Sequence, residues 1–84
     1  MSQSESPQWE YCILTNNQTY LYYTLYQQKG PYTIKKPYTT ALWSWCISTL
    51  GLLGWEAINT SYTSTASAWH FKRVFHPSNE QLQF

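Results

Sequence analysis

Cys46 and His70 are the one pair of side chains in this sequence whose types suit a nucleophile and a general base. Hydrolytic catalysis needs these two groups within hydrogen-bond reach and a third group that orients the base. The third group is missing, because the chain has no aspartate and its glutamates are scattered. Cys46 also lies in an apolar stretch, where a buried thiol behaves as a small hydrophobic side chain. We therefore predict no catalytic residues and a protein that is not an enzyme.

Metal and cofactor sites are not predicted either. The soft metal ligands are Cys12, Cys46, His70 and His76. They lack the paired spacing that lets one turn present two ligands to a metal ion. Gly51 and Gly54 follow an expected helix instead of preceding one, so they do not form a phosphate-binding loop. The two cysteines lie 34 positions apart, and we expect both as free, buried thiols.

Aromatic and basic side chains together suit a surface that binds nucleic acid. Tyr20, Tyr22 and Tyr26 share one face of an expected strand, and rings on a sheet can stack with single-stranded bases. The cations that could neutralise phosphates beside such a sheet are Lys35, Lys36, Lys72 and Arg73. The net charge of only +1 argues against a strong general attraction to nucleic acid. Single-stranded nucleic-acid binding is therefore an alternative, and pairing of the tyrosines across strands is the structural explanation of the same pattern.

Length and composition indicate how these residues must be positioned. The chain has 84 residues, of which 43% are hydrophobic, 19% aromatic and 11% charged, which excludes a disordered chain. We expect one domain over 8–76, with a disordered tail over 1–7 and a polar tail over 77–84. The first residues lack the basic and apolar regions of a secretory signal, and the longest apolar stretch, 50–55, is too short for a membrane span. The expected location is the cytoplasm.

The order of elements predicts an α+β fold. Alternation favours strands over 8–14, 19–27, 55–62 and 68–76, with the first two forming a hairpin. Residues 32–38 form either a short edge strand or a loop, because they combine β-forming side chains with lysines and a proline. A helix is expected from a cap at Thr39 or Thr40 to about Leu50. We predict a two-layer ββαββ domain, with one helix on one face of a mainly antiparallel sheet of about four strands.

The expected helix carries a broad apolar stripe and, from Thr40 to Gly54, no charged residue. The stripe consists of Leu42, Trp45, Cys46, Thr49, Leu50 and Leu53. Gly51 and Gly54 are each candidates for the left-handed conformation that ends a helix. Trp55 is then expected in the core, and Glu56 is expected to face away and to pair with Lys72 or Arg73 on the neighbouring strand.

Three blocks of sequence carry a resemblance to a known family. They are Trp9-Glu10-Tyr11, the stretch Leu-Gly-Leu-Leu-Gly-Trp-Glu over 50–56, and Trp-His-Phe-Lys-Arg over 69–73. In this order they resemble the bacterial domain-of-unknown-function 4177 family. The resemblance implies a small α+β domain with one helix across a sheet, gives Gly54, Trp55, Glu56 and Phe71 a structural role, and implies no activity. Residues 19–39 depart from it, because this segment is longer and more aromatic than the family's connector.

The function that the residues favour is a protein-interaction module that self-associates as a homodimer, either through sheet faces or through an edge strand. A helix covers one sheet face, so the other face meets water or a second copy. Depending on register, that face carries Tyr20, Tyr22 and Tyr26 or else Leu21, Tyr23 and Leu25. The expected interaction residues are Tyr20, Tyr22, Leu25 and Tyr26. A further alternative is a small hydrophobic ligand between helix and sheet, if Trp43 and Trp45 line a cavity. No membrane partner is expected.

Overall fold

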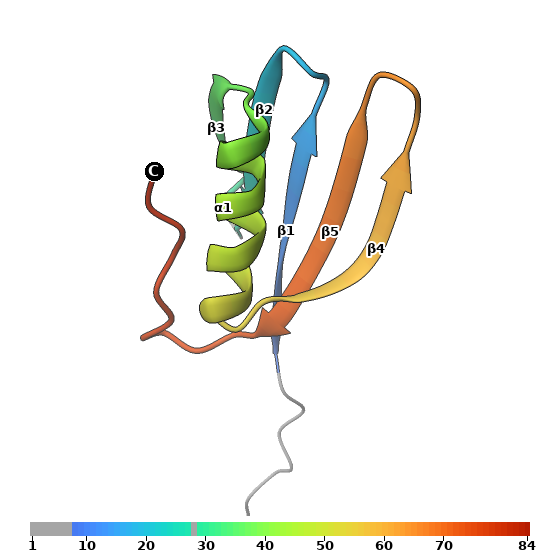
Figure 1. Ribbon diagram of the computed structural model, residues 1–84. Coiled ribbons are helices and arrows are strands. Elements are labelled where there is room, and N and C mark those ends of the chain that lie inside the picture. Colours follow the sequence, from blue (N-terminus) through green and yellow to red (C-terminus); the bar gives the residue numbers. More distant parts are fainter. Residues whose placement is uncertain (1–7, 28) are drawn as a thin grey trace, which may run out of the picture.

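The computed structural model describes residues 8–27 and 29–84, which form an α+β domain with one helix. The chain order of its elements is β1 (Trp9–Asn16), β2 (Tyr20–Tyr26), β3 (Tyr32–Pro37), α1 (Thr40–Leu52), β4 (Glu56–Tyr62) and β5 (Ser67–Val74). Figure 1 shows the helix lying along one face of an open, twisted sheet. The predicted fold class is confirmed at this level.

The sheet has five strands in the order β3-β2-β1-β5-β4, and every neighbouring pair is antiparallel. The prediction of about four strands was therefore one strand short. The additional strand is β3, which covers the segment where the sequence left a short edge strand and a loop open. Its lysines and Pro37 are compatible with a strand because β3 pairs on one side only.

The helix begins and ends where the capping signals lie. The Thr39 side chain accepts a hydrogen bond of 3.0 Å from the backbone amide of Leu42, which confirms one of the two expected caps. Gly54 has φ +93°, the left-handed conformation predicted for the helix exit. Gly51 does not take this conformation and stays inside the helix, which continues to Leu52 instead of stopping near Leu50.

The core is one cluster of residues from the strands, from α1 and from the segment after β5. Its buried hydrophobic residues are Cys12, Leu14, Leu21, Tyr23, Leu25, Cys46, Leu50, Trp55, Phe71 and Leu82. From the helix, Cys46 and Leu50 are buried, and Leu42 and Ile47 pack partly against the cluster, as does Leu53 directly after the helix. Trp45 was expected in the stripe but is 44% exposed, because it lies on the flank of the helix beside Phe84.

The C-terminal segment packs on the domain instead of extending from it as a polar tail. Leu82 is only 4% exposed, and the Phe84 ring lies 6.1 Å from that of Tyr23 and 6.3 Å from that of Trp45. Figure 1 shows this segment running alongside α1. The predicted end of the domain at residue 76 therefore excludes residues that belong to the core. The predicted tail over 1–7 lies outside the described residues.

Candidate interaction surface

The sheet face turned away from α1, here called the open face, carries five aromatic side chains. Side chains alternate between the two faces of a strand, and these five alternate with core residues. They are Trp9 and Tyr11 on β1 and Tyr20, Tyr22 and Tyr26 on β2. Trp9, Tyr11, Tyr20 and Tyr26 are 38–47% exposed, and Tyr22 is half-buried. Among the described residues, no helix covers this face.

The register decides between the two predicted tyrosine faces. Leu14 pairs with Tyr23 and Cys12 with Leu25, and these residues are buried on the helix side. Tyr20, Tyr22 and Tyr26 therefore point to the open face, as the first of the two alternatives predicted. Leu25 is 5% exposed and belongs to the core, so its prediction as an interaction residue was wrong. The cause is the period of two, which places Leu25 and Tyr26 on opposite faces.

Two aromatic residues of the open face were missed as interaction residues by the sequence analysis. Trp9 and Tyr11 alternate with core positions on β1, and Tyr11 lies directly across from Tyr26. A cavity of about 610 Å³ opens where β2 ends beside β1, and Trp9, Tyr11 and Tyr26 are among the residues that line it. The signal for Trp9 and Tyr11 was the alternation itself, but only the strand register joins them to the β2 tyrosines.

Two lysines lie among these rings. The Nζ atom of Lys35 is 4.0 Å from the centroid of the Tyr20 ring, and that of Lys72 is 4.3 Å from the centroid of the Trp9 ring. Tyr20 in turn contacts Tyr22, with the ring centroids 6.5 Å apart. Both lysines therefore make cation–π contacts, which are worth about 0.5–1 kcal/mol at exposed sites.

The other two predicted cations do not reach the open face. Lys36 lies on the helix side of β3, with its Nζ 5.9 Å from the Phe84 ring. Arg73 is 5% exposed and forms a salt bridge with Glu10 beneath the helix exit. The four cations therefore do not form one group, because neighbouring residues in a strand point to opposite faces.

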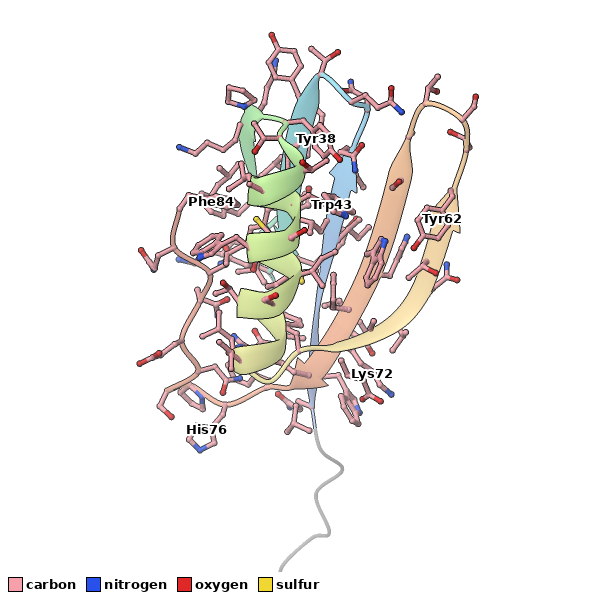
Figure 2. The ribbon with its side chains drawn as sticks, viewed as in Figure 1. Tyr38, Trp43, Tyr62, Lys72, His76 and Phe84 are labelled. Carbon is pink, nitrogen blue, oxygen red and sulfur yellow. The ribbon has the colours of Figure 1, made fainter. Side chains whose placement is uncertain are left out.

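Glu56 was predicted to pair with Lys72 or Arg73, and the structure places it across from Lys72 without a salt bridge between the two. Glu56 lies directly across from Lys72 on β5. Within the part of the chain that the structure describes, the one salt bridge joins Glu10 to Arg73. Lys72 lies over the Trp9 ring instead, toward the lower end of the sheet in Figure 2. The open face therefore has an acidic side chain, Glu56, and a basic side chain, Lys72, at its border.

The candidate nucleophile and base are separated by the sheet. Cys46 is buried in α1 on the helix side, whereas His70 lies across from Ile13 on the open face. Burial raises the pKa of the Cys46 thiol to about 11 and that of the Cys12 thiol to about 12. Both cysteines are free, as predicted, and burial keeps them protonated at neutral pH. In residues 8–27 and 29–84, no three His, Cys or Glu side chains come together in a metal-binding group.

The two helix tryptophans pack against other rings. Trp43 lies between Tyr38 and Trp69, at centroid distances of 6.3 and 6.5 Å, and Figure 2 shows Tyr38 and Trp43 together near the start of the helix. Trp45 contacts Phe84 and lines a hollow of about 330 Å³ on the outer flank of α1. The hollow is also lined by Lys36 of β3 and by Phe84, whereas Trp43 is not among its lining residues. The sequence named Trp43 and Trp45 together as the lining of an alternative ligand pocket.

Comparisons with protein-family models, with curated proteins and with solved structures found no match to this chain. No helix in the described residues is long and apolar enough to cross a membrane.

Proposed function

We propose that this protein is a non-enzymatic interaction module that self-associates through the open face of its sheet. The observation that carries the proposal is the group of five aromatic side chains on that face, four of them 38–47% exposed. Contiguous aromatic surface is uncommon on monomeric proteins, and Tyr and Trp are enriched in interfaces. In this proposal helix and sheet form two layers, and the open face binds a second copy.

The distribution of charge on the open face supports an interface. Ile13 on the central strand lies across from Thr24 and His70, so the middle of the face carries no lysine or glutamate. Lys35 is on the edge strand β3, and Lys72 lies toward one end of β5. The centre of the face is therefore uncharged, with aromatic side chains toward both of its ends, and depletion of charge at the centre is typical of a protein interface.

The area of the face suits a small dimer. Five strands about 4.8 Å apart and seven residues long, at about 3.3 Å per residue, span roughly 550 Å². Two such faces in contact bury roughly 1,100 Å², which is just above the minimum of about 1,000 Å² for a specific interface. The resulting association is weak enough to depend on concentration.

Light scattering over a range of protein concentrations tests the proposal. We expect an assembly of at least two chains of 9.9 kDa, and we expect Tyr22→Lys to halve its mass by placing a second charge beside Lys35 among the aromatic side chains of the face. Tyr32→Lys is the matched control, because Tyr32 is 52% exposed and points to the helix side of β3. A wild-type monomer at all concentrations contradicts the proposal, and so does an unchanged mass for Tyr22→Lys.

Single-stranded nucleic-acid binding is a second candidate, favoured by the two lysines that lie over Tyr20 and Trp9. Stacked bases need exposed rings, and phosphates need nearby cations. The test is binding of labelled oligonucleotides at several salt concentrations. We expect Lys35→Ala and Lys72→Ala to weaken binding and to reduce its salt dependence. Lys36→Ala is the control on the helix side, and an equal effect of all three variants speaks against this candidate.

Kinship with the domain-of-unknown-function 4177 family is part of the proposal and rests on the three sequence blocks. It brings no activity to the chain, in agreement with an interaction module. Two free, buried thiols are compatible with the reducing conditions of a cytoplasmic location.

A further inference from the structure

The two edges of the sheet differ in their protection against pairing with another strand. The β3 edge carries Lys35, Lys36 and Pro37 over six residues, and lysine and proline are the residues that commonly block an exposed edge. The β4 edge, of sequence Glu-Ala-Ile-Asn-Thr-Ser-Tyr, has neither residue type. All seven residues of β4 are exposed, including Ile58 at 48% and Tyr62 at 64%. β4 is thus the edge that remains open to pairing.

The backbone of β4 presents hydrogen-bonding groups along that edge. The Thr63 amide donates to the Ala66 carbonyl across the β4–β5 turn. Hydrogen-bonded pairs alternate along an antiparallel ladder, so Ser61 and Asn59 bond toward β5. The amide and carbonyl groups of Thr60 and Tyr62 consequently point away from β5. Figure 2 shows Tyr62 on the outer side of the sheet, far from the helix.

We propose that β4 pairs antiparallel with β4 of a second copy and joins the two sheets into one. The register that matches the outward backbone groups places Thr60 opposite the partner's Tyr62. Each copy offers the same two residues, so the contact is symmetric and closes as a dimer instead of extending into a filament. This interface is separate from the open face and does not rest on self-association there.

A second copy can occupy this edge because antiparallel pairing keeps the charged side chain of β4 far from the same side chain of the partner. The one charged residue of β4 is Glu56, at the start of the strand. Antiparallel pairing centred on Ser61 separates the two Glu56 side chains by about 30 Å, since ten residues lie between them at about 3.3 Å each. Parallel pairing would bring like charges together. A register irregularity between Ala57 and Asn59 ends the regular part of the edge, which confines the pairing to the segment near Thr60 and Tyr62.

Together with the open face, this interface predicts the size of the assembly. Edge pairing alone gives a dimer with a continuous sheet and a doubled open face. If the open faces also pack, two such dimers stack face to face as a tetramer. The face and the edge can therefore be tested independently, because each has its own variant.

Amide hydrogen exchange of the wild-type protein tests the edge directly. We expect the Thr60 and Tyr62 amides to exchange at least about tenfold more slowly at high protein concentration than at low concentration. The Thr33 and Lys35 amides are the internal control. By the same alternation, starting from the hydrogen bond between the Tyr38 amide and the Thr19 carbonyl, they point outward from the β3 edge. Equally fast exchange at Thr60, Tyr62, Thr33 and Lys35 at all concentrations overturns the proposal.

Variants separate the edge from the face. Tyr62→Lys places a cation at the proposed contact, and we expect it to halve the mass of the assembly and to remove the protection of Thr60. Tyr32→Lys is its control, because Tyr32 is likewise an exposed tyrosine on an edge strand. If Tyr62→Lys does not fold, a second pair of variants makes the same test. Thr60→Pro removes the outward amide, and Thr60→Val keeps it. Loss of mass with Tyr22→Lys but not with Tyr62→Lys supports the face and overturns the edge, and the reverse result supports the edge alone.

Discussion

Glu10 on β1 lies directly across from Arg73 on β5, and their side chains form a salt bridge. Both side chains are almost wholly shielded from solvent, with 10% of the Glu10 side chain and 4% of the Arg73 side chain exposed. Arg73 also donates a hydrogen bond of 2.7 Å to the Leu53 carbonyl at the end of the helix, and its guanidinium lies 4.3 Å from the Trp55 ring. Glu10 accepts a further hydrogen bond from Asn79 in the C-terminal segment. The pair thus joins two strands, the helix exit and the C-terminal segment at one end of the domain.

We expect Glu10→Ala to destabilise the protein by about 3–5 kcal/mol, because it leaves the Arg73 guanidinium buried without its counter-charge. Urea unfolding followed by tryptophan fluorescence measures the change in the free energy of unfolding. Glu56→Ala is the matched control: Glu56 is exposed and forms no salt bridge within the described residues. It should change stability by less than about 0.5 kcal/mol. Equal losses in the two variants would show that the Glu10–Arg73 contact does not stabilise the fold.

The two glycines at the end of α1 are predicted to respond in opposite directions to alanine. Gly54 has φ +93°, which an alanine adopts only with strain, so Gly54→Ala should lose at least about 1 kcal/mol. Gly51 is inside the helix, and a Cβ built there meets no atom within 4 Å. Gly51→Ala should therefore gain about 0.5–1 kcal/mol. Thermal unfolding of the two variants beside the wild type checks both signs, and a stabilised Gly54→Ala would contradict the assigned conformation.

Local patterns predicted much of the fold because short-range chemistry decides it. The Thr39 cap, the Gly54 exit and the alternation of β1 each depend on residues close in sequence. The sequence could not decide on β3, because lysines and proline suit a loop as well as an edge strand. It also missed the packing of Leu82, because a single apolar residue in a polar segment has no periodicity to mark it.

The candidate surface was predicted in part. Tyr20, Tyr22 and Tyr26 were grouped correctly by their spacing of two and four residues. Adding Leu25 ignored the alternation between faces, and adding Lys36 and Arg73 treated neighbouring basic residues as one group. Trp9 and Tyr11 lie on the same face as the β2 tyrosines because of the strand register. The register depends on pairing between segments that are distant in sequence.

Leu82 is expected to hold the C-terminal segment on the core. The side chain is 4% exposed and belongs to the same cluster as Leu25 and Tyr23. Leu82→Ala should cost about 2–3 kcal/mol, toward the lower end of the range for a buried leucine, because a segment outside the sheet can partly collapse into the space. Gln83→Ala, at the next and exposed position, should be nearly neutral. Unchanged urea midpoints for both variants would mean that the segment adds nothing to stability.

Alkaline pH should destabilise the protein through its buried thiols. Burial raises the pKa of Cys12 from 9.0 in an ordinary thiol to about 12, and that of Cys46 to about 11. Below pH 9 the thiols are protonated in both the folded and the unfolded chain, so their contribution does not vary. Between pH 9 and 11 the unfolded chain loses these protons and the folded chain keeps them, so stability falls as pH rises, by at most about 1.4 kcal/mol per pH unit for each thiol.

Unfolding by urea under reducing conditions at several pH values measures this slope. Cys12→Ala should reduce the fall of the free energy of unfolding with pH above pH 9 and leave its pH dependence between pH 6 and 8 unchanged. The small cavity that the variant creates lowers stability by the same amount at every pH. A variant with the same alkaline slope as the wild type would show that the Cys12 thiol is not held protonated by burial.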